Sequence, residues 1–194
     1  MASLGRLFSR AVAMAAATSG AMTFDALRGR RPEVLADLMD RHGLEIQNVA
    51  YLILRDWAMA EDVLADTLMV ALDRGDTLRD EAALRRWLLR IAVNRAIDAR
   101  RSSSRVVQLR LVPDREARRT FDDDRIALLG AVERLAPRMR AALVLRYYAD
   151  LPVRDVAEAL GTSGNTIKTQ LREALAQLRV TLGEADDFLE DRHG

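Results

Sequence analysis

The sequence has no cysteine, only two histidines and few aromatic residues, and each scarcity excludes a class of chemistry. Without cysteine the chain can form neither a disulfide framework nor a thiolate metal site. His42 and His193 alone make neither a metal cluster nor a catalytic set. No apolar run approaches the ~20 residues of a membrane span. We therefore expect no metal, no cofactor, no catalytic residues and no membrane insertion, and interpret the chain as a cytoplasmic protein that is not an enzyme.

Signals for β-strands are also absent, because no stretch alternates with period two and only 5% of the residues are aromatic. Apolar residues instead recur at helical spacing over most of the chain between Pro32 and Leu182. The stripes predict helices that open at 34–39 and run over 46–54, 63–72 and 84–101, with 56–60 as a joint, and they resume at 126–135. The predicted fold class is all-α, with two small helical domains joined by a flexible linker.

Composition also sets the expected segment boundaries. Residues 1–31 are expected to be a disordered N-terminal extension, and residues 32–103 form the first domain. Residues 104–124 have the composition of a linker, with five arginines balanced by five acidic residues and no helical stripe. Residues 125–183 form the second domain, and residues 184–194 form an acidic tail.

The second domain contains the pattern of a helix-turn-helix within residues 135–178. An apolar stripe follows Pro152, which suits the first turn of a helix, and Gly161 ends that helix. Thr162, Ser163 and Gly164 supply turn and N-cap chemistry before a second apolar stripe begins at Ile167. The other face of this second helix is polar and carries Asn165, Thr166, Lys168, Thr169 and Arg172. Polar residues at the start of such a helix are typical of one that enters the major groove of DNA.

Any two amphipathic helices joined at a glycine would show a similar pattern, so charge has to decide between DNA binding and plain packing. Residues 125–183 contain nine basic and five acidic residues, a net charge of +4, whereas the whole chain has a net charge of +1. Lys168 is the single lysine of the chain, and it lies on the polar face of the second helix. The local excess of basic residues favours phosphate binding.

The first domain has two polar faces. Asp62, Asp66, Met69 and Asp73 share the side of one helix opposite its apolar stripe. No second carboxylate or histidine cluster matches them, which favours a solvated or protein-docking face over a metal or acid-base site. The next helix follows the polar loop RGDTLRDEA and carries a basic surface around Trp87: Arg85, Arg86, Arg90, Asn94, Arg95, Asp98, Arg100 and Arg101. Such a surface suits single-stranded nucleic acid, while Trp87 itself lies on the apolar stripe and is expected in the core.

Together these stretches resemble an extracytoplasmic-function sigma factor, the small group of the bacterial sigma-70 family that retains only region 2 and region 4. LMDRHG resembles the start of region 2, and AEDVLADTLMVAL resembles the segment that docks on the clamp helices of RNA polymerase. LRRWLLRIAVNRAIDARR resembles the segment that melts and reads the minus-ten promoter element. The stretch 135–178 resembles region 4, which reads the minus-thirty-five element. The motifs cover about Val34 to Leu182 in the order and spacing of the family.

The resemblance implies a promoter-specificity subunit with promoter DNA and core RNA polymerase as partners. Asp62 and Asp66 would hold the clamp helices of the beta-prime subunit, and the beta flap would be a second contact. An anti-sigma factor is implied as a further partner. The loop 79–83, with Arg79, Asp80 and Glu81, would receive a base flipped from the non-template strand.

The remaining implied contacts are to the two promoter elements. Asn94, Arg95, Asp98 and Arg101 would face the minus-ten DNA. Lys168, Thr169 and Arg172 would enter the major groove of the minus-thirty-five element, with Asn165 and Thr166 near the phosphates.

The chain departs from the family pattern in both domains. Ala65, Asp66 and Leu68 stand where the family often has Gln-Glu and an aromatic residue, and Val70 and Leu72 stand where an Arg and a Trp are common. Gln170 and Glu173 replace residues that are often basic, which predicts fewer phosphate contacts. Two other interpretations remain: a stand-alone helix-turn-helix regulator, and a sigma-like decoy for an anti-sigma factor. The decoy would ordinarily include a receiver domain, for which no strand-helix alternation is present.

Overall fold

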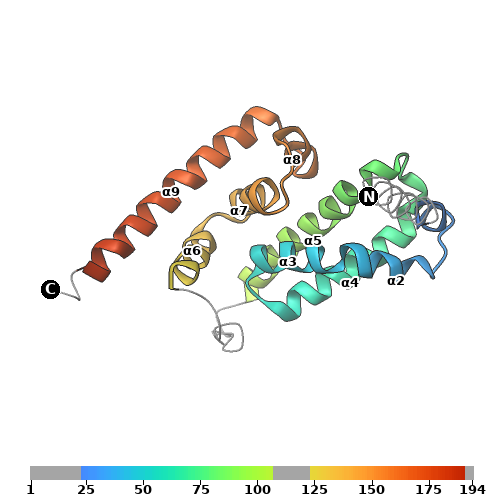
Figure 1. The fold of residues 1–194 in the computed structure, drawn as a ribbon, viewed down its shortest axis with the longest axis horizontal. Coiled ribbons are helices and arrows are strands. Elements are labelled where there is room, and N and C mark those ends of the chain that lie inside the picture. Colours follow the sequence, from blue (N-terminus) through green and yellow to red (C-terminus); the bar gives the residue numbers. More distant parts are fainter. Residues whose placement is uncertain (1–22, 107–122, 191–194) are drawn as a thin grey trace, which may run out of the picture.

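The computed structural model describes residues 23–106 and 123–190, and within these ranges every regular element is a helix (Figure 1). The all-α prediction is thus confirmed. The side chains of residues 103–106, 123–125 and 184–190 are not described. The segments predicted as an N-terminal extension and a linker lie largely outside the described residues, at 1–22 and 107–122, and of the predicted acidic tail only residues 191–194 lie outside them.

The first domain is built from three long helical segments that pack on one another. The first is a continuous run of α2 (Val34–Leu38), the π-helical turn η1 (Met39–Gly43) and α3 (Leu44–Leu54). The second is α4 (Trp57–Arg74), and the third is α5 (Leu84–Val106). The short helical turns η2 (Gly75–Thr77) and η3 (Glu81–Ala83) connect α4 to α5. The apolar stripes predicted from the sequence form the buried core among these helices.

The joint predicted at residues 56–60 is shorter in the structure. Asp56 is the N-cap of α4, and its Oδ1 accepts a hydrogen bond of 2.9 Å from the Met59 backbone N–H. A carboxylate that satisfies a free N–H of the first turn allows the helix to begin directly after it. Trp57 therefore begins α4 and stacks on Tyr51 of α3, with ring centroids 4.3 Å apart. The start of this helix was predicted too late because residues 57–60 are all apolar and so show no alternation between an apolar and a polar face.

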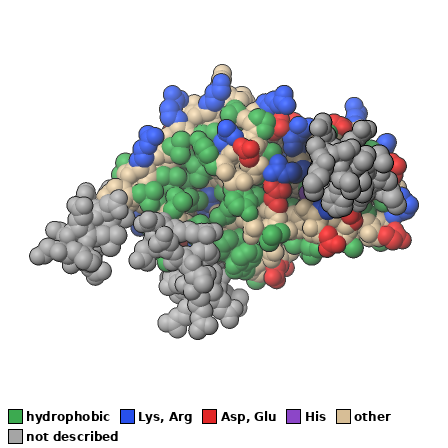
Figure 2. Space-filling view, viewed as in Figure 1, with side chains coloured by type: hydrophobic (Ala, Val, Ile, Leu, Met, Phe, Trp, Pro, Cys, Tyr) green, Lys and Arg blue, Asp and Glu red, His purple; other side chains and the backbone are tan. Residues whose placement is uncertain are grey.

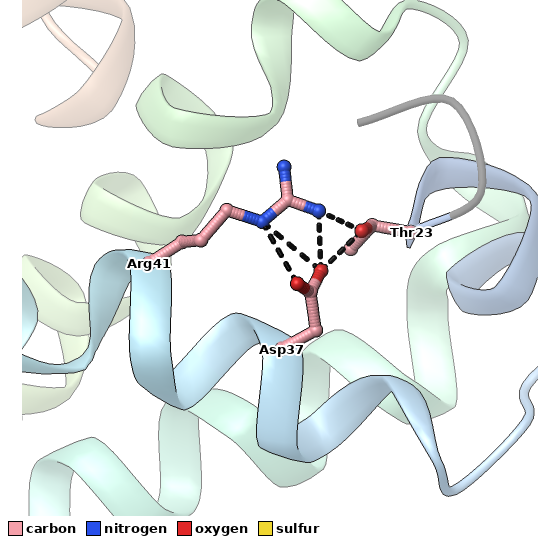
Figure 3. Close-up of polar contacts among 3 residues, drawn as sticks. All are labelled: Thr23, Asp37 and Arg41. Carbon is pink, nitrogen blue, oxygen red and sulfur yellow. Dashed lines mark hydrogen bonds and ion pairs between the residues drawn. The ribbon is translucent and has the colours of Figure 1, made fainter. Parts of the chain in front are cut away.

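The first domain begins before the predicted boundary at Pro32. Residues 23–28 form a helix, Leu27 is fully buried, and Phe24 packs against the core. Thr23, Asp37 and Arg41 form a polar cluster in which Asp37 accepts from both neighbours, tying this helix to α2 and η1 (Figure 3). At the other end, Arg30 pairs with Asp76 at 2.8 Å. The prediction of disorder up to residue 31 is therefore wrong for residues 23–31, because a short helix gains its stability from packing that periodicity does not show.

Gly75 makes this packing possible, and its substitution gives a prediction. A Cβ added at Gly75 would lie 2.2 Å from the backbone oxygen of Leu27, so the N-terminal helix would have to move. We expect Gly75→Ala to lower the free energy of unfolding by about 1–3 kcal/mol, measured by urea denaturation. Gly130→Ala is the control, because nothing lies within 4 Å of its added Cβ in α6 (Asp123–Arg134) and alanine favours a helix. Equal effects of the two substitutions would contradict the close approach of Leu27.

The second domain comprises α6, α7 (Pro137–Leu143), the π-helical turn η4 (Val144–Tyr148), α8 (Val153–Ala159) and the long α9 (Gly164–Glu190). Pro137 occupies the first turn of α7, where its missing N–H has no helical partner to lose. A small core joins α6, α7 and α9 through residues such as Val132, Leu143 and Leu178. The backbone of α9 continues as a helix beyond Gly183, into the segment predicted as a tail.

The two domains are in direct contact. One cluster of buried side chains runs from the α3, α4 and α5 core into η4, α8 and the start of α9, and includes Leu88, Leu145 and Ile167. Contacts between α5 and α8, and between α3 and η4, form the seam. The sequence predicted two tethered domains but gave no sign that they share a core.

Candidate nucleic-acid interface

The helix-turn-helix of the second domain consists of α8, a turn over 160–163 and α9. Gly161 has φ +61°, the left-handed conformation that ends a helix and that glycine adopts at little cost. Ser163 precedes α9, and its Oγ accepts a hydrogen bond of 3.1 Å from the Thr166 backbone N–H. Val156, Ile167 and Leu171 are buried where the two helices meet. The turn chemistry predicted for residues 161–164 is confirmed, with Ser163 as the capping residue.

The polar residues predicted to contact the minus-thirty-five element all lie on the exposed side of α9. Ile167 and Leu171 are buried on the opposite side of the helix. The side chains exposed to solvent are those of Asn165, Thr166, Lys168, Thr169 and Arg172. Figure 2 shows basic side chains along the edge of the molecule over α9. A helix start that exposes hydrogen-bonding groups and positive charge on a rigid support can enter a major groove.

The first-domain residues predicted to face the minus-ten element lie on α5 and on the loop before it. Arg95, Asp98 and Arg101 have exposed side chains on α5, and Arg79 and Glu81 are exposed on the loop. Trp87 is partly buried against the core, as predicted. Asp80 has a structural role as the N-cap of η3, because its Oδ1 accepts a 3.0 Å hydrogen bond from the Ala82 backbone N–H. The sequence interpretation gave Asp80 only a base-receiving role and missed this capping bond.

Asn94 and three arginines of α5 face the second domain. The Asn94 Nδ2 donates to the backbone oxygens of Arg90, at 2.8 Å, and Ala159, at 3.3 Å. Arg86 pairs with Asp155 at 3.4 Å, and Arg90 lies 3.6 Å from Glu158. Arg85 pairs with Glu45 and donates to the Ala149 oxygen at 2.7 Å. The sequence identified these groups as a basic surface but contained no signal for their partners.

The carboxylates predicted to dock polymerase lie on the exposed side of α4. Asp62 and Asp66 are one turn apart and exposed, as are Met69 and Asp73. Val63, Leu64 and Leu68 on the opposite side are buried. Thr67, also buried, donates its hydroxyl to the Val63 oxygen at 2.7 Å, so it leaves no unsatisfied polar group in the core. An acidic, rigid stripe with an exposed methionine can bind a complementary basic surface.

Two negative findings hold for the described parts of the chain. Residues 23–106 and 123–190 contain no group of three or more histidine, aspartate or glutamate side chains placed to hold a metal ion. Among the helices of the same ranges, none is long and apolar enough to cross a membrane.

Comparison with known proteins matches both domains to families. Residues 38–106 match the sigma-70 region 2 family, and residues 125–178 match the sigma-70 region 4 family. These two stretches coincide with the domain that contains α4 and α5 and with the helix-turn-helix domain. The matches follow one another in the order that the sequence motifs indicated.

Curated relatives match over most of their length. The ECF RNA polymerase sigma factor SigL of Mycobacterium tuberculosis is 32% identical over 155 residues, covering 76% of this chain and 88% of that protein. The RNA polymerase sigma factor SigV of Bacillus subtilis is 25% identical over 167 residues, covering 79% and 93%. The RNA polymerase sigma-E factor of Streptomyces coelicolor is 31% identical over 134 residues, covering 66% and 73%.

Solved structures share the fold. CnrH, solved with the cytosolic domain of CnrY, aligns with a TM-score of 0.66 and 22% identity over 86% of this chain and 98% of that one. The sigma factor RpoE of Bartonella quintana, solved with the anti-sigma factor NepR, aligns with a TM-score of 0.61 and 23% identity over 76% and 97%.

Proposed function

Because the chain belongs to the extracytoplasmic-function sigma factors of the sigma-70 family, we propose a division of its work between the two domains. The chain is a sigma factor that directs promoter-specific initiation by RNA polymerase. In our proposal the first domain docks on polymerase and melts and reads the minus-ten element, and the second domain reads the minus-thirty-five element. The coexistence of an exposed helix-turn-helix with a region 2 domain on one chain carries this proposal.

The exposed polar faces support specific roles for their residues. Asp62 and Asp66 bind the clamp helices of the polymerase beta-prime subunit, and the second domain contacts the beta flap. Lys168, Thr169 and Arg172 read bases in the major groove, while Asn165 and Thr166 bind phosphates. Arg95, Asp98 and Arg101, joined by Asn94, face the minus-ten DNA.

The loop between α4 and α5 receives the flipped base. Arg79 and Glu81 present exposed side chains there, and Asp80 holds the shape of the loop through its bond to Ala82. Unstacking a base costs a few kcal/mol, so a loop of fixed shape that accepts one base favours promoters that carry it. The polymerase supplies the chemistry of RNA synthesis, and this chain acts in the cytoplasm as a specificity subunit regulated by an anti-sigma factor.

Run-off transcription tests this function. Core RNA polymerase with the purified chain is expected to transcribe a subset of a library of upstream sequences, and the selected sequences should share two separated elements. Core polymerase alone supplies the baseline. Enrichment of a single element that the chain binds tightly without polymerase would instead show a stand-alone regulator, and no enrichment would overturn the proposal.

A further inference from the structure

Three arginines from different helices meet at the carboxyl end of α3. Arg55 is the C-cap of this helix and has a left-handed backbone, with φ +60°. Arg140 of α7 donates from Nη1 to the Ile53 backbone oxygen at 2.6 Å. Arg100 of α5 donates from Nη1 to the Leu54 backbone oxygen at 2.8 Å. The last residues of α3 thus gather three guanidinium groups, which we call the arginine cluster.

The arginine cluster carries more positive charge than its surroundings offset. Within residues 23–106 and 123–190, neither Arg55 nor Arg140 forms an ion pair with a carboxylate. Asp56, the next residue, accepts instead from a backbone N–H of α4. Burial and the nearby charge of Arg100 lower the pKa of Arg140 to about 10, and Glu133 opposes this shift, so Arg140 keeps its charge at neutral pH. The carboxyl end of a helix supplies about half a negative charge, which together with Glu133 does not offset three guanidinium groups.

Some nitrogen atoms of the arginine cluster are buried without a hydrogen-bond partner. In the described parts of the chain, Nε and Nη1 of Arg55 and Nε of Arg140 meet no acceptor. Arg140 is 1% exposed, and a buried donor that is left unpaired costs free energy. The bond to Ile53 accounts for Nη1 of Arg140, and the Tyr51 ring, whose centroid is 4.9 Å from Arg55 Cζ, accounts for the position of Arg55. Neither contact uses the unpaired nitrogen atoms.

We propose that the arginine cluster binds the phosphoryl group of a small ligand, either free pyrophosphate or a nucleotide. A phosphoryl group carries about two negative charges at neutral pH and has several acceptor oxygens, so it can bind guanidinium groups that approach from different helices. A carboxylate has a single charge and two oxygens, which match the cluster less well. Arg55 is half-buried, so its guanidinium can turn from Tyr51 toward an ion at the surface without movement of the backbone.

The site is separate from the faces to which we assign promoter and polymerase contacts. Arg55 and Arg100 belong to the first domain and Arg140 to the second, and none of them has a role in the function proposed above. The inference therefore goes beyond that function, and its tests need neither promoter DNA nor polymerase.

Isothermal titration calorimetry of the whole chain with pyrophosphate, at fixed ionic strength, tests the site. The parent chain is expected to bind pyrophosphate saturably at one site. Arg55→Gln removes a guanidinium that caps no helix, so the fold should be retained, and it should weaken binding roughly ten-fold or more. Absence of saturable binding to the parent, or equal binding by Arg55→Gln, would overturn the proposal.

Matched variants separate the site from general attraction by positive charge. Arg28→Gln also removes an arginine that lies over an aromatic ring of the first domain, with its Cζ 5.7 Å from the Phe24 centroid. This variant should bind pyrophosphate as the parent does, and so should Lys168→Ala with Arg172→Ala on α9. Equal weakening by Arg28→Gln would show attraction by net charge alone. Loss of binding in the α9 variant would place the ligand on the helix-turn-helix, and either result would contradict the arginine cluster.

Tryptophan fluorescence locates the ligand. Trp57 stacks on Tyr51, the ring over which Arg55 lies, and Trp87→Phe would leave Trp57 as the single tryptophan of the chain. Pyrophosphate is expected to change this fluorescence over the same concentrations that release heat, because Arg55 moves away from the ring. Adding Arg55→Gln should abolish the change. Heat of binding without a change in Trp57 fluorescence would show that the ligand binds elsewhere.

ADP distinguishes the two sources of the phosphoryl group, because it carries a diphosphate joined to a nucleoside. Tighter calorimetric binding of ADP than of pyrophosphate would identify a nucleotide as the ligand, and tighter binding of pyrophosphate would identify the free ion. In both cases Arg55→Gln should weaken binding and Arg28→Gln should not. Failure of both probes to bind the parent chain would overturn the proposal, whatever the outcome of transcription with polymerase.

Discussion

Asp62→Arg combined with Asp66→Arg is expected to abolish association with core RNA polymerase while leaving the fold intact. Both side chains are exposed on α4, and the buried residues of that helix lie on its other side. Reversal therefore places like charge against a basic partner without disturbing the core, and like-charge juxtaposition at an interface costs several kcal/mol. Co-purification with polymerase measures the association, and circular dichroism measures the helix content.

A matched variant separates position from net charge. Asp25→Arg with Asp40→Arg reverses two exposed carboxylates of the same domain, away from α4. This control should still co-purify with polymerase. Unchanged co-purification of the α4 variant, alongside unchanged helix content, would refute the docking role of Asp62 and Asp66.

The sequence predicts the structure best where the features of a helix depend only on residues within that helix or next to it. The stripe through Ile167 and Leu171, the left-handed position at Gly161 and the cap at Ser163 are local features, and the structure shows all of them. The polar sides of α4 and α9 follow from the same periodicity, because a residue opposite a buried stripe has to face solvent. Exposure of the candidate docking and groove-contact residues was predictable for this reason.

The sequence did not predict features that depend on contacts between segments far apart in the chain. Arg140 is a charged residue in a basic stretch, and nothing nearby in the sequence indicates that its guanidinium reaches the Ile53 oxygen in the other domain. The helix at 23–28 is too short to show a periodic apolar stripe, and its order is explained by contacts with distant residues, such as the close approach of Leu27 to Gly75 and the bond of Thr23 to Asp37. Asp80 was seen as a loop carboxylate, although the N-cap of a helical turn uses the same residue type. Burial and partners of charged groups come from tertiary packing, which periodicity does not encode.

Lys168→Ala combined with Arg172→Ala is expected to remove most recognition of the minus-thirty-five element. Each side chain is worth about 1–3 kcal/mol if it pairs with a base in the groove. Arg179→Ala with Arg134→Ala is the matched control, because both arginines are exposed in the second domain and the loss of charge is equal. Promoter binding by the polymerase complex, measured over a range of salt concentrations, should weaken strongly only for the first pair. Equal losses would show that net charge alone attracts the DNA.

The same assay separates the reading of one element from the reading of the other. Glu81→Ala changes an exposed loop side chain and leaves the capping bond of Asp80 to Ala82 in place. It should alter base preference within the minus-ten element and spare the minus-thirty-five element, because the flipped base lodges in this loop. In the polymerase complex the two elements are on the order of 85 Å apart, and distant sites without shared partners contribute additively. The triple variant Glu81→Ala, Lys168→Ala, Arg172→Ala should therefore show the sum of the minus-ten and minus-thirty-five defects. A change of minus-ten base preference caused by the two α9 substitutions alone would disprove this division of labour.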